Sequence, residues 1–203
     1  MIMSMYKKIC ITNRHLVFGE KKTEITEKLW TEYYTQIEKA LEKNIFALIL
    51  REKDCNQNQY KEIAKKVISL CSKYQTKCIL HSFVDTAIEL KHPLIHLPLV
   101  QFLELDESQK DHFTAIGVSV HSVEEAKLAQ KHGAAYLTAG HIFQTQCKKG
   151  VPPRGLNFLK SICEQVSIPV YAIGGIHQEN VQSCIRQGAD GICMMSEFFH
   201  KIK

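Results

Sequence analysis

Short apolar runs recur along the chain and alternate with longer stretches in which apolar residues return every three or four positions. Continuous apolar runs are typical of strands buried on both faces, and the three-to-four spacing is typical of helices with one buried face. We predict eight strands, at 8–12, 45–50, 77–80, 94–99, 115–120, 134–139, 168–173 and 191–195. Eight strands separated by helices predict an α/β fold of the (β/α)8 TIM-barrel class, a closed parallel barrel rather than an open sheet.

Helices are predicted between these strands. They cover 23–44, 59–74, 83–90, 122–132, 156–165 and 179–187. Ser122 and Glu125 have the spacing of a capping box at the start of the fourth of these helices. A shortened C-terminal helix is predicted from Ser196 to the end of the chain, and 101–114 has no readable pattern. All of these units fit one compact domain that covers 1–203.

Polar side chains directly follow several of the predicted strands. Arg51 and Lys53 follow the second strand, His81 the third and His121 the fifth. In a parallel barrel the loops at the carboxyl ends of the strands carry the active site, so we expect these four side chains at one face of the barrel. A surface turn is the alternative interpretation of 51–54.

The densest polar cluster is 140–155, which follows the sixth predicted strand. It contains His141, Thr145, Cys147, Lys148, Lys149 and Arg154. An imidazole can take and return a proton near neutral pH, so His141 is the candidate acid/base catalyst of a reaction that moves a proton between two carbons. His121 competes for that role, whereas Cys147 lacks a partner at the spacing of an activated nucleophile. The alternative is a solvated basic loop.

Glycines and a serine follow the last two predicted strands. Gly174 and Gly175 come after the seventh strand, and Met195 and Ser196 come at the end of the eighth. In eight-stranded barrels these loops commonly bind phosphate, because glycine lets the backbone approach the ligand and the N–H groups at a helix start attract anions. We therefore predict a phosphate site here, with a plain tight turn as the alternative.

The composition is that of an ordinary globular protein, with 203 residues, 45% hydrophobic and 23% charged. The apolar runs are far shorter than the roughly 20 residues that cross a bilayer, and no secretory signal is visible, so we expect a cytoplasmic protein without a membrane partner. A net charge of +5 without a basic stripe favours a small anionic ligand over nucleic acid. The eight cysteines form no C-x-x-C pair, so we expect free thiols, no metal and no cofactor.

Four segments resemble the thiamine phosphate synthase superfamily of phosphate-binding barrels, namely 51–53, 117–126, 140–154 and 172–176. Within the superfamily, 140–143, 147–150 and 154–155 resemble the TenI-type thiazole tautomerase branch. The resemblance implies an isomerase of thiamine biosynthesis. Such an enzyme converts a thiazole carboxylate phosphate with an exocyclic double bond into its aromatic tautomer, and His141 would be its general acid/base.

The resemblance also implies roles for other residues. The substrate-binding set is Arg51, Lys53, His81, His121, Thr145, Lys148 and Arg154. The phosphate-binding set is Gly174, Gly175, Met195 and Ser196. The partner is then a thiazole phosphate, and we expect a homodimer because barrels of this size commonly dimerise.

The chain departs from the synthases of the superfamily at the positions that hold magnesium in them. Synthases carry Asn-Asp after the third strand and Gly-Gln-x-Asp after the fourth, where this chain has His81-Ser82 and 98–101. Magnesium without carboxylates would be poorly held. Ile49 and Cys147 also replace residues that synthases carry. We therefore expect the tautomerase. The alternatives are a thiamine phosphate synthase, which couples hydroxymethylpyrimidine pyrophosphate with thiazole phosphate, and a non-catalytic regulatory protein related to thiamine.

Overall fold

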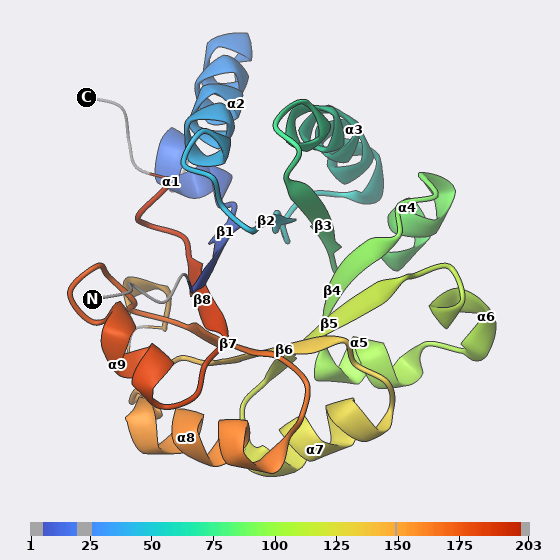
Figure 1. The fold of residues 1–203 in the computed structure, drawn as a ribbon. Coiled ribbons are helices and arrows are strands. Elements are labelled where there is room, and N and C mark those ends of the chain that lie inside the picture. Colours follow the sequence, from blue (N-terminus) through green and yellow to red (C-terminus); the bar gives the residue numbers. More distant parts are fainter. Residues whose placement is uncertain (1–5, 20–25, 149, 200–203) are drawn as a thin grey trace.

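Eight parallel strands form a closed barrel in chain order, and β1 pairs with β8 to close it (Figure 1). This computed structural model describes residues 6–19, 26–148 and 150–199. The strands are β1 Lys7–Ile11, β2 Ala47–Leu50, β3 Lys77–His81, β4 Leu94–Pro98, β5 Ala115–Val120, β6 Tyr136–Gly140, β7 Val170–Ile173 and β8 Gly191–Met194. The predicted (β/α)8 barrel is confirmed, because each apolar run forms one strand of the same sheet.

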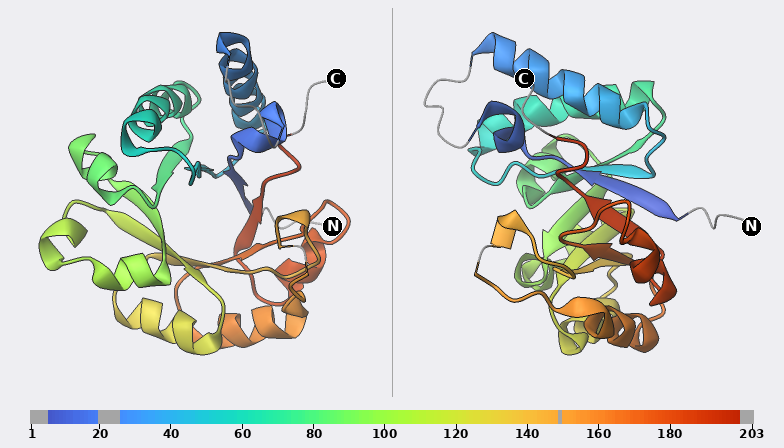
Figure 2. Two further views of the ribbon diagram at one scale, coloured as in Figure 1. Left: turned by 180° about the vertical axis from the view of Figure 1, so that it is seen from behind. Right: turned by 90° about the vertical axis from the view of Figure 1, so that its left-hand side faces the viewer.

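The helices lie around the outside of the barrel, as Figures 1 and 2 show. They are α1 Arg14–Phe18, α2 Glu27–Leu41, α3 Gln57–Lys73, α4 Val84–Glu89, α5 Leu99–Glu104, α6 Glu107–Lys110, α7 Val123–Lys131, the 3-10 helix η1 Gln146–Lys148, α8 Gly155–Gln165 and α9 Val181–Arg186. No helix in the described part of the chain combines the length and the apolar character needed to span a membrane.

Side-chain caps determine where three of the longer helices begin. Thr26 caps α2, and Asn56 forms a complete capping box at the start of α3. At α7 the predicted box forms only in part. The Ser122 hydroxyl accepts from the Glu125 backbone N–H at 3.1 Å, but the Glu125 carboxylate accepts from the His121 N–H at 2.6 Å. This carboxylate therefore holds the residue before the cap and fixes the end of β5.

Two apolar clusters fill the molecule, one on each side of the barrel wall. The larger lies between the strands and the helices. The smaller lies inside the barrel and consists of Ile9, Ile11, Ala47, Ile49, Ile79, Tyr171 and Cys193. Gly117 makes room for this interior packing, since a Cβ there would lie 2.0 Å from the ring of Tyr136. Side chains thus fill the barrel interior near the amino ends of the strands, so a cavity can form only at the carboxyl ends of the strands.

The structure corrects three expectations about the elements. The segment after β1, where no helix was predicted, forms α1, which starts where the Asn13 side chain accepts from the His15 N–H at 3.0 Å. The unreadable 101–114 region contributes α5 and α6, which are too short to show a helical period. The shortened C-terminal helix is wrong over 196–199, where the chain forms a turn closed by bonds from Phe198 and Phe199 to the Met195 carbonyl.

Candidate active site

A cavity of about 620 Å³ opens at the carboxyl ends of the strands. Its size is that of a small-molecule site. Eleven of the residues predicted for the site line it, namely Arg51, Lys53, His81, His141, His121, Thr145, Lys148, Gly174, Gly175, Met195 and Ser196. The structure therefore brings together side chains that are far apart in the chain. Arg154, also predicted, does not line the cavity, and its guanidinium lies 5.3 Å from the ring centre of Phe158.

Three cationic side chains, Arg51, Lys53 and Lys148, face the cavity. Burial lowers the pKa of the Lys53 ammonium, and the positive charges of Arg51 and Lys148 lower it further. Because these like charges repel one another, binding of an anion between them would relieve the repulsion and is therefore favoured. No Asp or Glu of the described residues lines the cavity.

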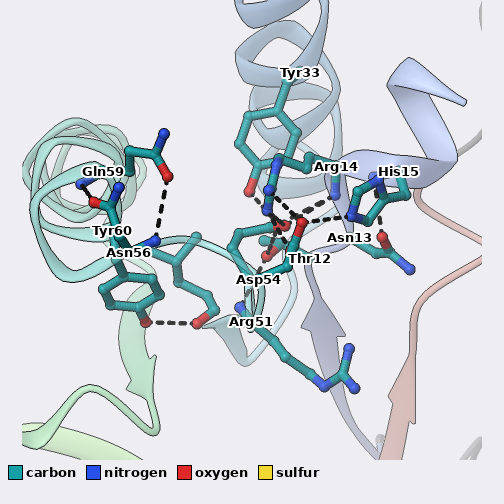
Figure 3. A network of polar contacts seen from close by, with 12 residues as sticks. Thr12, Asn13, Arg14, His15, Tyr33, Arg51, Asp54, Asn56, Gln59 and Tyr60 are labelled. Carbon is teal, nitrogen blue, oxygen red and sulfur yellow. Dashed lines mark hydrogen bonds and ion pairs between the residues drawn. The ribbon is translucent and has the colours of Figure 1, made fainter. Parts of the chain in front are cut away.

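Successive side chains of the segment after β2 point alternately into the cavity and away from it. Arg51 and Lys53 line the cavity, whereas the Glu52 carboxylate is buried on the other side. Glu52 accepts from the hydroxyls of Thr12 and Tyr33, each at 2.8 Å. The Arg51 backbone N–H donates to the same Thr12 hydroxyl at 3.0 Å. Figure 3 shows the Arg51 side chain pointing away from this cluster.

Arg14 completes the anchor behind Arg51 and Lys53. Its guanidinium donates to Glu52 at 3.1 Å and to both oxygens of Asp54, at 2.8 and 2.6 Å (Figure 3). The contact with Asp54 is bidentate, which is the strongest geometry for this pair of groups. Both acidic residues of 51–54 are therefore used to hold the loop, and both basic residues are left for the cavity.

Two neutral histidines lie at the floor of the cavity. His96 is within hydrogen-bond distance of Ser119 Oγ, at 2.8 Å, and of the Tyr136 hydroxyl, at 3.0 Å. Burial and the nearby Lys53 charge lower the pKa of His96 to about 3. His81 stacks on His96 at 5.8 Å between ring centres, and burial, followed by the positive charges of Arg51 and Lys53, lowers the pKa of His81 well below the ordinary value.

His141 projects from the end of β6 and is buried. Its Nε2 donates to the Val151 carbonyl at 3.3 Å, and its own carbonyl accepts from the Arg154 N–H at 2.9 Å. The loop from 141 to 155 is thereby closed at its base. Lys148 lies at its tip, 3.4 Å from the His121 Nε2 at the rim. The right-hand view of Figure 2 shows this loop, in orange, at the same end of the barrel as α1.

The two glycines after β7 allow the His141 loop to pack closely. Gly174 has φ +100° and Gly175 has φ +63°, which favour glycine. A Cβ on Gly174 would lie 2.3 Å from the His141 Cβ, and one on Gly175 would lie 2.3 Å from the Gln144 carbonyl oxygen. These glycines are thus required by packing as well as available for a ligand. Ser196 lines the cavity but begins a turn and not the expected helix.

Several cavity residues were missed in the sequence, among them His96, Ser119 and Thr138. Each lies within a strand rather than after it. A strand alternates its side chains between the interior and the helix layer, so these polar residues mark inward positions. His96 is buried and both of its ring nitrogens have partners, yet its ring lines the cavity. Lys149 and the side chain of Cys147 lie outside the described residues.

Magnesium does not fit the residues at this site. In the described part of the chain, no group of three or more His, Cys, Asp or Glu side chains could hold a metal ion. At the positions where the resemblance places metal ligands, Gln101 Nε2 donates to the Ser82 carbonyl at 3.3 Å, and Gln101 Oε1 is buried without a partner among the described residues. A single neutral amide oxygen is a poor ligand set for a hard dication, which takes several oxygen ligands.

Comparison with known proteins identifies relatives along most of the chain. The family model described as thiamine monophosphate synthase matches residues 22–198. The thiamine-phosphate synthase of Clostridium acetobutylicum is 35% identical over 170 residues, which cover 81% of this chain and 79% of that protein. The thiamine-phosphate synthase of Clostridium novyi is 32% identical over 193 residues, which cover 94% of this chain and 89% of that protein. The solved structure of thiamine phosphate pyrophosphorylase from Pyrococcus furiosus matches with a TM-score of 0.74 at 32% identity and covers 94% of this chain and 86% of that one.

The prediction of a thiazole tautomerase, and with it of an isomerase, is wrong. The relatives that match over most of the chain are named synthases, which are transferases, and this agrees with the alternative of the sequence analysis. The likeness to the wider superfamily is confirmed. The prediction rested on the 140–155 cluster and on the missing magnesium ligands, and both are compatible with a synthase whose diphosphate site differs.

Proposed function

The chain belongs to the thiamine monophosphate synthase family, and on this premise we propose that it is a transferase that couples a hydroxymethylpyrimidine diphosphate to a thiazole phosphate. The observation that carries the proposal is the cavity at the barrel mouth, where three cations and several neutral polar groups converge. Its volume of about 620 Å³ suits two small aromatic rings with their phosphates.

In the proposed reaction the thiazole ring nitrogen forms a bond to the methylene carbon of the pyrimidine. The bond from that carbon to the diphosphate oxygen breaks, and its electron pair leaves with pyrophosphate. Negative charge therefore grows on the leaving group in the transition state. Arg51, Lys53 and Lys148 line the cavity where fixed positive charge would stabilise it.

The thiazole phosphate is proposed to bind at the loops after β7 and β8. Gly174, Gly175, Met195 and Ser196 line this side of the cavity. The backbone conformation of the glycines allows a close approach of an anion, and the Ser196 hydroxyl is exposed to accept or donate a hydrogen bond.

The histidines have a binding role in this proposal. A thiazole ring nitrogen that attacks carbon carries no proton, so the bond-forming step needs no general base at His141. We place His141 against the substrate, between the phosphate loops and the cationic residues, since it lines the cavity and packs on Gly174. His81, kept neutral by its lowered pKa, offers a hydrogen bond to a neutral pyrimidine ring rather than charge. Both ring nitrogens of His96 already have partners in Ser119 and Tyr136, so His96 supports the cavity floor instead.

The test is a coupling assay with purified protein and both substrates, in which the condensed product and pyrophosphate are measured. We expect equal amounts of the two, formed only when both substrates are present, with activity strongly reduced in Arg51→Gln. Lys131→Gln is the matched control, because Lys131 lies exposed on α7 and outside the cavity. Absence of the condensed product in the wild type, with and without magnesium, would refute the proposal.

A further inference from the structure

Three carboxylates in the described segments around the cavity are engaged away from it. Glu52 is held by Arg14 and by two hydroxyls, and its side chain is 1% exposed. Asp54 is paired with Arg14 and His15. Glu125 accepts from the His121 N–H and lies 3.5 Å from the His121 ring nitrogen. The segment after β2 and the start of α7 therefore hold these acidic groups away from the cavity.

The cations of the mouth have the opposite arrangement. Among the described residues, Arg51, Lys53 and Lys148 line the cavity, and none of them forms an ion pair with a carboxylate. They come from two separate segments, the end of β2 and the loop after β6. Two segments that each present cations across one opening can contact an anion from both sides.

The charge of this cluster matches that of a diphosphate. A terminal phosphate carries about 1.5 to 2 negative charges near pH 7, so a diphosphate ester carries roughly two to three. Three fixed cations can neutralise such a group with no added dication. A dication would instead meet three like charges and no carboxylate of the described residues.

We propose that Arg51, Lys53 and Lys148 bind and stabilise the diphosphate in place of a divalent cation, so that the site works without magnesium. The identity of the anion rests on the proposed function. Magnesium in solution pairs with free pyrophosphate and lowers its charge, so it should weaken binding at this site rather than support it.

The direct test is titration of inorganic pyrophosphate into the wild-type protein by calorimetry, in EDTA and in excess MgCl₂. We expect saturable binding in EDTA that is at least as tight as in magnesium. Lys53→Gln and Arg51→Gln should each weaken binding roughly 10- to 100-fold, as expected for loss of one charge-assisted contact, while Lys131→Gln should leave it unchanged. Binding that requires magnesium or is tightened by it would overturn the inference, as would no binding in either buffer.

The same proteins in the coupling assay separate this inference from the proposed function. Turnover in EDTA together with pyrophosphate binding in EDTA supports both. Turnover and binding that both need magnesium overturn the inference and leave the transferase standing. Pyrophosphate binding in EDTA without turnover in either buffer refutes the transferase and leaves a metal-free diphosphate site. Circular dichroism of each variant shows that a weakened titration does not come from unfolding.

Discussion

Replacing Glu52 by glutamine should be one of the most damaging single changes outside the cavity. The Glu52 carboxylate accepts from the Thr12 and Tyr33 hydroxyls, from the Arg14 backbone N–H and from the Arg14 guanidinium. Its side chain is 1% exposed, so water cannot replace these partners. Glutamine keeps the shape but removes the charge, and it turns one acceptor into an NH₂ group that faces donors.

The expected cost follows from the burial of Arg14, whose side chain is 7% exposed. Removing one partner of a buried ion pair costs about 3–5 kcal/mol, because the other charge stays buried. Asp54 remains as a second partner of Arg14, so the lower end applies, about 3 kcal/mol. For a domain of this size, that corresponds to a fall in Tm of about 6–12 °C.

Urea unfolding of the wild type, Glu52→Gln and Asp54→Asn measures this effect. Asp54→Asn is the matched control, because Asp54 is half exposed, at 51%, and solvent can replace its contacts. We expect its loss to be about 1 kcal/mol or less. A loss below about 1 kcal/mol for Glu52→Gln, or equal losses for the two variants at unchanged m-values, would show that the Glu52 network does not anchor the loop.

Three further predictions concern pH, backbone and loop. Because the pKa of His96 is lowered to about 3, this group stays neutral in the folded state but takes up a proton in the unfolded state as the pH falls below about 6.5, so His96 by itself should lower stability by about 2 kcal/mol from pH 8 to pH 5, in addition to the effect of His81; urea unfolding of His96→Gln should show a smaller fall than the wild type, and an identical fall would contradict the assignment. Gly174→Ala should destabilise by several kcal/mol through its φ and its clash with the His141 loop, whereas Gly133→Ala, with a similar φ and open space, should cost only about 1–2 kcal/mol in the same experiment. Lys148→Gln should raise the KM for the diphosphate substrate in steady-state assays without changing thermal stability, since Lys148 is exposed at the loop tip; a lowered Tm with an unchanged KM would assign it a structural role.

The barrel and the location of its site were readable in the amino-acid order. A continuous apolar run such as 45–50 is typical of a strand covered on both faces, as in a parallel sheet with helices outside, so local composition was enough to place the strands. Polar residues directly after those runs, such as Arg51 and His81, had to meet at one end of a closed parallel barrel.

The reaction was assigned wrongly from the sequence because one well-placed histidine is compatible with several chemistries. His141 does line the cavity, but a histidine that transfers protons and a histidine that only binds substrate cannot be told apart in a sequence. Likeness over the whole chain, rather than over one loop, separated the two assignments.

Which neighbours face the ligand depends on contacts between distant segments. In 51–54 four charged residues are adjacent in sequence, and nothing local separates Arg51 and Lys53 from Glu52 and Asp54. The separation arises because Arg14, which lies 38 residues from Glu52 and 40 from Asp54 in the chain, binds both carboxylates. In the same way, the turn at 196–199 forms where Phe199 stacks on Tyr33 of α2, at 6.1 Å between ring centres. Periodicity and residue type thus suffice to predict the strands and helices and to identify which end of the barrel carries the polar residues. The charge and shape of the cavity depend instead on contacts between residues far apart in the chain, which leave no local pattern in the sequence.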